Sequence, residues 1–157
     1  DMMKECILAT RDRLSEYKMI SYFDYALGDE NRSIGLSYNS TTDCANSLTS
    51  TLGKMKRTVE MRRLDDIREI ANIKEIDLLK IDVEGFEEPV LGGAIKTLEK
   101  SQYVIIELHL PNHLEDYSEI VGIFLRSGHM LYKVKSRNLY FKKYSGLPRL
   151  VRDHEIS

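Results

Sequence analysis

The segment 76–110 constrains the fold most strongly, because it alternates a strand, a helix and a strand. The runs "IDLLKID" (76–82) and "YVIIELHL" (103–110) are short and apolar, which is typical of buried strands. Between them, apolar residues recur at helical spacing and predict a helix over about 85–100. Two strands joined by one helix form a parallel pair with a right-handed crossover. The sequence therefore predicts an α/β fold with a parallel core.

Further elements are predicted on both sides of this βαβ unit. Before it, the patterns indicate helices over 2–17 and 64–73 and strands over 19–27, 33–39 and 58–64. After it, a helix over 111–126 precedes "HMLYKVK" and "NLYFKKY", which predict an antiparallel hairpin at 129–144. The segment 39–51 is dominated by Ser, Thr, Asn and Asp and is predicted to be a polar loop.

Size and composition favour a single domain over residues 1–157, because 157 residues can bury a substantial core. The net charge of −2 indicates neither a nucleic acid nor a membrane as the main partner. No apolar run approaches the ~20 residues that a membrane-spanning helix needs. Cys6 and Cys44 are too few for a disulfide framework and lack metal-ligand spacing. They indicate buried thiols in a reducing compartment, and hence a cytoplasmic protein.

Four polar side chains stand where the two strands of the βαβ unit end. Asp82 and Glu84 follow the first strand, and Glu107 and His109 end the second. The carboxyl ends of parallel strands form the edge at which open α/β sheets bind ligands. Each pair is spaced i, i+2, so its two side chains point to the same side of an extended segment. The sequence therefore predicts one crevice that receives up to three carboxylates and one imidazole, beside a glycine, Gly85, that lets the backbone come close.

Each of these side chains also has a purely structural interpretation. Acidic residues before a helix commonly cap it or offset its dipole; we favour this role for the pair 87–88 and leave it open for Glu84. Lys80 lies two residues before Asp82 on the same face, so the two can form a structural ion pair. A lone histidine such as His109 is more often hydrogen-bonded at a strand end than catalytic. Only the four positions together point to a site.

Several segments resemble one enzyme family. "LDDI" (64–67), followed by "IDLLKIDVEGFEEPVLGGAIKTLEKSQYVIIELH" (76–109), resembles the C-terminal signature of the FkbM-type S-adenosylmethionine-dependent methyltransferases. "YALGDENRSIGL" (25–36) is similar to a segment further upstream in that family. The resemblance implies a class I methyltransferase (Rossmann-like) fold. Its sheet has the strand order 3-2-1-4-5-7-6, and its last two strands form an antiparallel hairpin, as predicted independently above.

The resemblance also implies roles for individual residues. Asp82 matches the acid that ends the fourth strand, near the reacting methyl group, and Glu84 belongs to the same motif. Glu107 matches the acid that ends the fifth strand on the substrate side. With His109 these are the candidate catalytic residues, while Asp82 and, more loosely, Asp29 are the candidates for binding the cofactor S-adenosylmethionine. No residue is assigned to a metal.

The chain departs from the family in its glycines. It has no G-x-G sequence, and the one adjacent pair, 92–93, falls inside a predicted helix. It therefore resembles the C-terminal two-thirds of a methyltransferase domain, without the N-terminal strands and the glycine-rich loop that hold the cofactor. The strand 76–82 would then lack a neighbour, and an open apolar edge promotes association. We expect this edge to be closed by a longer natural protein, by strand 19–27 or by another chain, as in a homo-oligomer.

Three functions are consistent with these patterns. The leading hypothesis is O-methylation of a small-molecule or saccharide hydroxyl. The second is a non-catalytic remnant of the fold that serves binding or assembly, which the absent glycine turn favours. The third, ranked last, is a metal-dependent hydrolase that uses the acids and the histidine at the strand ends, Asp82, Glu84, Glu107 and His109, as ligands.

Overall fold

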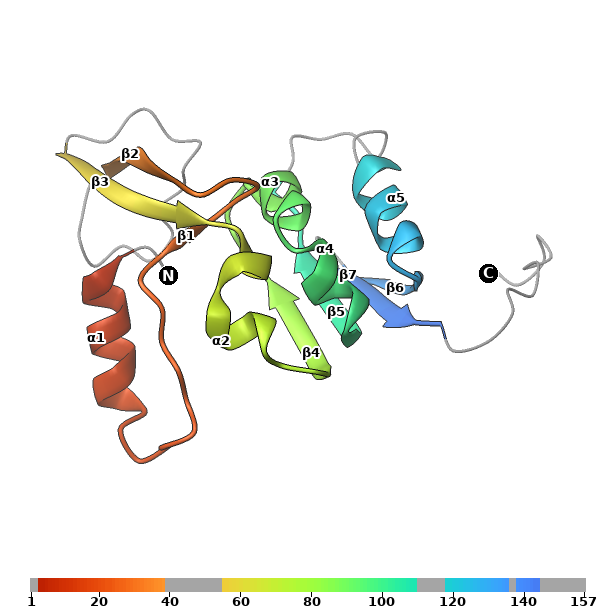
Figure 1. Ribbon diagram of the computed structural model, residues 1–157, viewed down its shortest axis with the longest axis horizontal. Coiled ribbons are helices and arrows are strands. Elements are labelled where there is room, and N and C mark those ends of the chain that lie inside the picture. The colour runs from red at the N-terminus through yellow and green to blue at the C-terminus, as the bar shows by residue number, and fades with distance from the viewer. Residues whose placement is uncertain (1–2, 39–54, 110–117, 136–137, 145–157) are drawn as a thin grey trace.

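The computed structural model describes residues 3–38, 55–109, 118–135 and 138–144. These residues form two mixed sheets that lie next to each other along the long axis of the molecule (Figure 1). The strands are β1 (Ala26–Leu27), β2 (Arg32–Tyr38), β3 (Met55–Arg62), β4 (Ile76–Ile81), β5 (Ser101–Glu107), β6 (His129–Lys135) and β7 (Asn138–Lys143). The helices are α1 (Lys4–Arg13), the 3-10 turn η1 (Leu64–Asp66), α2 (Arg68–Ala71), α3 (Glu87–Gly92), α4 (Ile95–Glu99) and α5 (Ser118–Arg126).

The larger sheet has the order β4-β5-β7-β6 and confirms the predicted βαβ unit and hairpin. β4 and β5 are parallel, with Leu79 opposite Val104, and β6 and β7 are antiparallel. β7 pairs antiparallel with β5, so the hairpin extends the parallel pair on one side. This order is the one expected for the last four strands of the seven-stranded sheet that the resemblance implied.

The helices α3, α4 and α5 lie along one side of this sheet and bury its apolar face (Figure 1). Phe124 of α5 stacks on Phe141 of β7 with ring centroids 3.7 Å apart, and both side chains are fully buried. Leu91 and Leu98, from α3 and α4, are also fully buried. Each such side chain contributes about 1.5–3 kcal/mol through its removal from water, so this core anchors the strand ends that carry the polar residues.

The smaller sheet has the order β1-β3-β2, with β1 parallel and β2 antiparallel to β3. Its core includes Met3, Leu36 and Met61, and α1 contributes Cys6. Cys6 is disulfide-bonded, so the predicted free thiol is wrong. Disulfides are rare in reducing compartments, so the compartment that the cysteine count suggested stays a prediction. The other cysteine, Cys44, lies outside the described residues.

A tight joint connects the two sheets. Gly93, at the end of α3, lies so close to Gly28 that a Cβ on Gly93 would stand 1.9 Å from the carbonyl oxygen of Gly28. The backbone N–H of Asp65 donates to the carbonyl oxygen of Gly93 at 3.0 Å. The Asp65 carboxylate accepts the backbone N–H groups of Lys96 and Thr97, at 2.9 and 2.8 Å, at the start of α4. The "LDD" and "LGGA" segments are therefore structural neighbours.

This joint explains why the predicted helix over 85–100 is two helices. Gly93 and Ala94 separate α3 from α4, because Asp65 supplies the acceptor that the first N–H groups of α4 need. The predicted helix over 64–73 likewise divides into η1 and α2. Asp65, 31 and 32 residues away in the chain, accepts the hydrogen bonds that mark where α4 begins. Helical spacing alone does not reveal these bonds.

The predicted strand over 19–27 is mostly wrong. Within the described residues only Ala26–Leu27 pairs, and it pairs with β3, so this segment does not close the outer edge of β4. Met19 is 97% exposed, and Leu78 on β4 is 56% exposed. No described strand pairs with β4 on the side away from β5, so closure of that edge by a longer chain or a second copy stays a prediction.

The remaining predicted elements are confirmed where the structure describes them. β2 and β3 occupy the predicted strands, α1 the centre of the predicted N-terminal helix, and α5 the second half of the predicted helix over 111–126. The predicted polar loop over 39–51 lies outside the described residues. No helix in the described parts is long and apolar enough to span a membrane.

Candidate functional site

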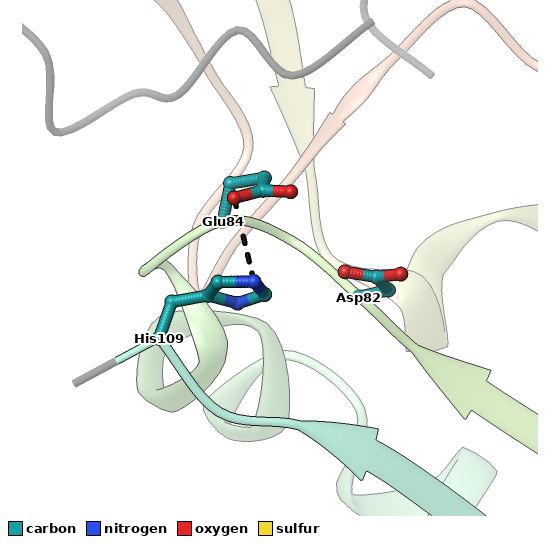
Figure 2. Close-up of side chains that lie close together, drawn as sticks. All are labelled: Asp82, Glu84 and His109. Atoms are coloured by element: carbon teal, nitrogen blue, oxygen red, sulfur yellow. Dashed lines mark ion pairs between the residues drawn. The ribbon is translucent and has the colours of Figure 1, made fainter. Parts of the chain in front are cut away.

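The strands β4 and β5 are parallel, so the residues that follow them lie at the same edge of the sheet, where both strands end. Figure 2 shows Asp82 just beyond the end of β4 and His109 just beyond the end of β5. Ile81 and Leu108, which precede these two residues, are 4% and 1% exposed, so each polar side chain follows a firmly buried one. Burial of the apolar neighbours fixes where the chain leaves the sheet. The predicted meeting of the two strand ends is confirmed.

A tight turn places Glu84 above the histidine (Figure 2). The N–H of Phe86 donates to the carbonyl oxygen of Val83 at 3.3 Å and closes this turn. Glu84 has a φ of 51° and Gly85 a φ of 93°, and Glu84 is the one non-glycine residue with positive φ among those described. Such a conformation costs a residue with a Cβ about 1 kcal/mol or more. The fold holds the Glu84 carboxylate at this edge despite that cost.

His109 stands at the centre of three carboxylates. Its Nε2 lies 3.4 Å from Oε2 of Glu84 and 3.8 Å from Oε1 of Glu107, while its Nδ1 lies 3.0 Å from Oε1 of Glu87. Only the contact with Glu87 has the length of a good hydrogen bond. The imidazole is 12% exposed, and the side chains of Glu84 and Glu107 are 40% and 23% exposed. Nε2 therefore faces two partly exposed carboxylates.

Glu87 is the functional-site residue that the sequence interpretation missed. It was assigned with Glu88 to the helix start, yet its side chain is only 1% exposed. Its Oε1 accepts hydrogen bonds from the backbone N–H of Gly85 and from Nδ1 of His109, each 3.0 Å long. The position is three and four residues before Val90 and Leu91, on the apolar stripe of the helix. An acid on a buried stripe was the signal that could have revealed it.

Asp82 has the structural partner that the sequence suggested. Nζ of Lys80 donates to Oδ2 of Asp82 at 2.6 Å, and this hydrogen bond raises the pKa of Lys80. The two side chains are 54% and 36% exposed, so the pair contributes at most about 1 kcal/mol to stability. Asp82 also belongs to the cluster around the histidine, because one ligand atom from each of Asp82, Glu84 and His109 lies within 4.8 Å of the other two.

Asp29 is not one of these three residues. Its carbonyl oxygen accepts a hydrogen bond from Nη1 of Arg63 at 3.1 Å, and its Cβ lies beside Gly92 at the joint between the sheets. The proposed adenine-side role of Asp29 is therefore independent of the cluster at the strand ends and stays a prediction.

The comparison with protein families identifies the chain. The model of the methyltransferase FkbM domain matches residues 7–133, which include the smaller sheet, β4, β5 and the whole cluster. The chain belongs to the FkbM methyltransferase family. The resemblance drawn from "KIDVEG" is thereby confirmed, and the family implies a Rossmann-like fold and S-adenosylmethionine as cofactor. The mixed α/β sheets agree with that fold.

One characterised relative supports the same family. The chain is 42% identical over 50 residues to the 2-O-methyltransferase NoeI of Sinorhizobium fredii (strain NBRC 101917 / NGR234). The match covers 32% of this chain and 21% of the relative, so the chain spans about a fifth of that protein's length in the match. No solved structure matches the chain.

Proposed function

We propose that this chain is part of an S-adenosylmethionine-dependent O-methyltransferase that acts on a hydroxyl of a saccharide or a small molecule. The observation that carries the proposal is the convergence of Asp82, Glu84 and His109 at the carboxyl ends of β4 and β5 in an FkbM-family chain. The match to a 2-O-methyltransferase supports a hydroxyl as acceptor. We infer that the same four residues predicted from the sequence, Asp82, Glu84, Glu107 and His109, form the reaction site.

The cluster fits the reactive end of the cofactor better than its nucleotide end. Carboxylates attract the positive charge of a sulfonium, and Asp82, Glu84 and Glu107 bring three of them to one edge. The nucleotide needs a glycine-rich turn in this fold, and the sequence contains no G-x-G. We therefore propose that these 157 residues form the C-terminal two-thirds of a single class I methyltransferase domain.

The chemistry needs little beyond alignment and a proton acceptor. When bound, S-adenosylmethionine supplies a methyl group on sulfur, to which the acceptor oxygen bonds as the sulfur–methyl bond breaks. A carboxylate of the cluster accepts the hydroxyl proton, so a neutral ether leaves. Glu107 suits this role because its side chain is 23% exposed and its Oε1 lies 3.8 Å from Nε2 of His109. Orientation of the hydroxyl by the remaining groups supplies much of the rate.

Calorimetry with S-adenosylhomocysteine tests the proposal. The natural protein that carries this chain is expected to bind it, and the 157-residue chain alone is expected not to. Binding by the chain alone would contradict the proposal that part of the cofactor site is missing. Failure of both to bind would contradict the methyltransferase itself and favour a non-catalytic remnant of the fold.

A further inference from the structure

We propose that Asp82, Glu84 and His109 form a binding site for a divalent transition-metal cation beside the acceptor hydroxyl, with Mn²⁺ as the probe. This inference rests on the proposed function and adds a cation to it, whereas the sequence suggested metal ligands at these positions only for a hydrolase, ranked last. The site is built from the ends of two neighbouring strands and from the turn between Val83 and Phe86 (Figure 2).

The donor atoms have the right chemistry and nearly the right spacing. Two carboxylates and one imidazole form a mixed oxygen and nitrogen set, which Mn²⁺ accepts more readily than Mg²⁺ or Ca²⁺ do. Metal–ligand bonds of about 2.1 Å place neighbouring ligand atoms about 3 Å apart and opposite ones about 4.2 Å apart. The three donors already lie within 4.8 Å of one another. Rotation of the partly exposed Asp82 and Glu84 side chains would close the remaining distance.

The buried Glu87 is an independent observation that points to a ligand on His109. Its side chain is 1% exposed and holds Nδ1 of the imidazole at 3.0 Å. In the tautomer whose Nδ1 donates to Oε1 of Glu87, Nε2 carries the lone pair that a cation would take. Histidine ligands of metals are held in this way by a carboxylate on the opposite ring nitrogen. The second oxygen of Glu87, Oε2, is buried and has no hydrogen-bond partner within the described parts of the chain.

The local charge also favours a cation. Four carboxylates surround the one imidazole, namely Asp82, Glu84, Glu87 and Glu107. Lys80 pairs with Asp82 at 2.6 Å and also interacts electrostatically with Glu107, so it offsets part of this negative charge, and the carboxylates outnumber it. Clustered carboxylates repel one another, and a divalent cation between them offsets that repulsion.

Three protein ligands leave open positions, which is typical of catalytic rather than structural metal sites. An acceptor hydroxyl in such a position would be oriented and made more acidic. Asp82 and Glu84 would then be ligands, and Glu107, outside the set of three, would remain as the proton acceptor. Vicinal hydroxyls of a saccharide could occupy two open positions at once, which links the cation to the substrate class.

Electron paramagnetic resonance of Mn²⁺ with the natural protein, stripped of metal by EDTA, tests this site directly. One Mn²⁺ is expected to bind, and Asp82→Asn and His109→Gln are each expected to weaken binding by at least 100-fold. Glu87→Gln, which removes only the positioning of the ligand, is expected to weaken it 10–100-fold. The matched control is Asp77→Asn, the same charge change at an exposed position five residues earlier in the chain, which is expected to leave binding unchanged.

Absence of Mn²⁺ binding, or equal binding by wild type and Asp82→Asn, would overturn the inference. The result is separable from the proposed function. If methyl transfer persists in EDTA, and separate experiments show binding of S-adenosylhomocysteine but not of Mn²⁺, the cation site is wrong and the methyltransferase stands. Site-specific Mn²⁺ binding without any binding of S-adenosylhomocysteine would support the cation site and remove the methyltransferase.

Discussion

Two short acidic motifs of this chain, "LDD" and "DVE", differ in the partners of their carboxylates. In "LDD", both carboxylate oxygens of Asp65 are used by donors at the start of α4, including the hydroxyl of Thr97 at 2.7 Å. In "DVE", Asp82 and Glu84 turn toward a histidine and toward each other at an open edge. Acids whose oxygens are all engaged by the backbone stabilise a fold. Asp82 and Glu84 are engaged instead by side chains, Lys80 and His109, at a strand edge where we propose that a ligand binds.

The largest expected effect concerns the joint that "LDD" helps to build. Gly93→Ala should lower the free energy of unfolding by about 3 kcal/mol or more, because the new Cβ would overlap the carbonyl oxygen of Gly28, 1.9 Å away. Gly35→Ala is the matched control. A Cβ at Gly35 meets nothing within 4 Å, and stability should change by no more than about 0.5 kcal/mol. Urea unfolding measures both, and equal effects would mean that the joint is not tight.

The next effect separates the two acids of "LDD". Asp65→Ala should cost about 2 kcal/mol in urea unfolding, because two backbone N–H groups and one hydroxyl lose their acceptor. Asp66→Ala should cost less than about 1 kcal/mol, because Asp66 is 48% exposed and contacts Arg63 and Asn31 at the surface. A larger loss for Asp66 than for Asp65 would reverse the assignment of the structural acid.

A smaller effect extends the comparison to the histidines. Burial lowers the pKa of His129, whose Nε2 lies 2.9 Å from the carbonyl oxygen of Ser101. The unfolded chain therefore binds a proton at a higher pH than the folded one does, so this contribution to stability is complete above about pH 6.5 and is lost as the pH falls. His129→Gln should flatten that dependence between pH 7 and 5. An unchanged dependence would mean that His129 is not kept neutral by the fold.

The sequence predicted the parts of the molecule that local patterns encode. Apolar runs were enough to predict β4 and β5, and alternating residues followed by a short turn were enough to predict the hairpin of β6 and β7. The strand ends brought Asp82 and His109 together as expected, because parallel strands share an edge.

What the sequence did not predict depends on partners distant in the chain. Glu87 contacts His109, 22 residues away, and Asp65 caps a helix 31 and 32 residues away. Helical spacing marks Glu87 as lying on a buried face and does not name the imidazole that makes burial tolerable. Residues 19–25 have the composition of a strand, yet a strand forms only where the chain makes hydrogen bonds to a neighbour. Here pairing with β3 begins only at Ala26, although β3 extends back to Met55.

The most direct test of the account compares Asp82→Asn with Asp65→Ala in the natural protein, measuring methyl transfer to a saccharide hydroxyl and the free energy of unfolding on the same samples. Asp82→Asn is expected to lower the transfer rate by about 100-fold or more while changing stability by less than about 1 kcal/mol. Asp65→Ala is expected to lose stability and to retain transfer wherever it remains folded. An Asp82→Asn protein that transfers methyl groups at the wild-type rate would contradict the assignment of the reaction to this edge.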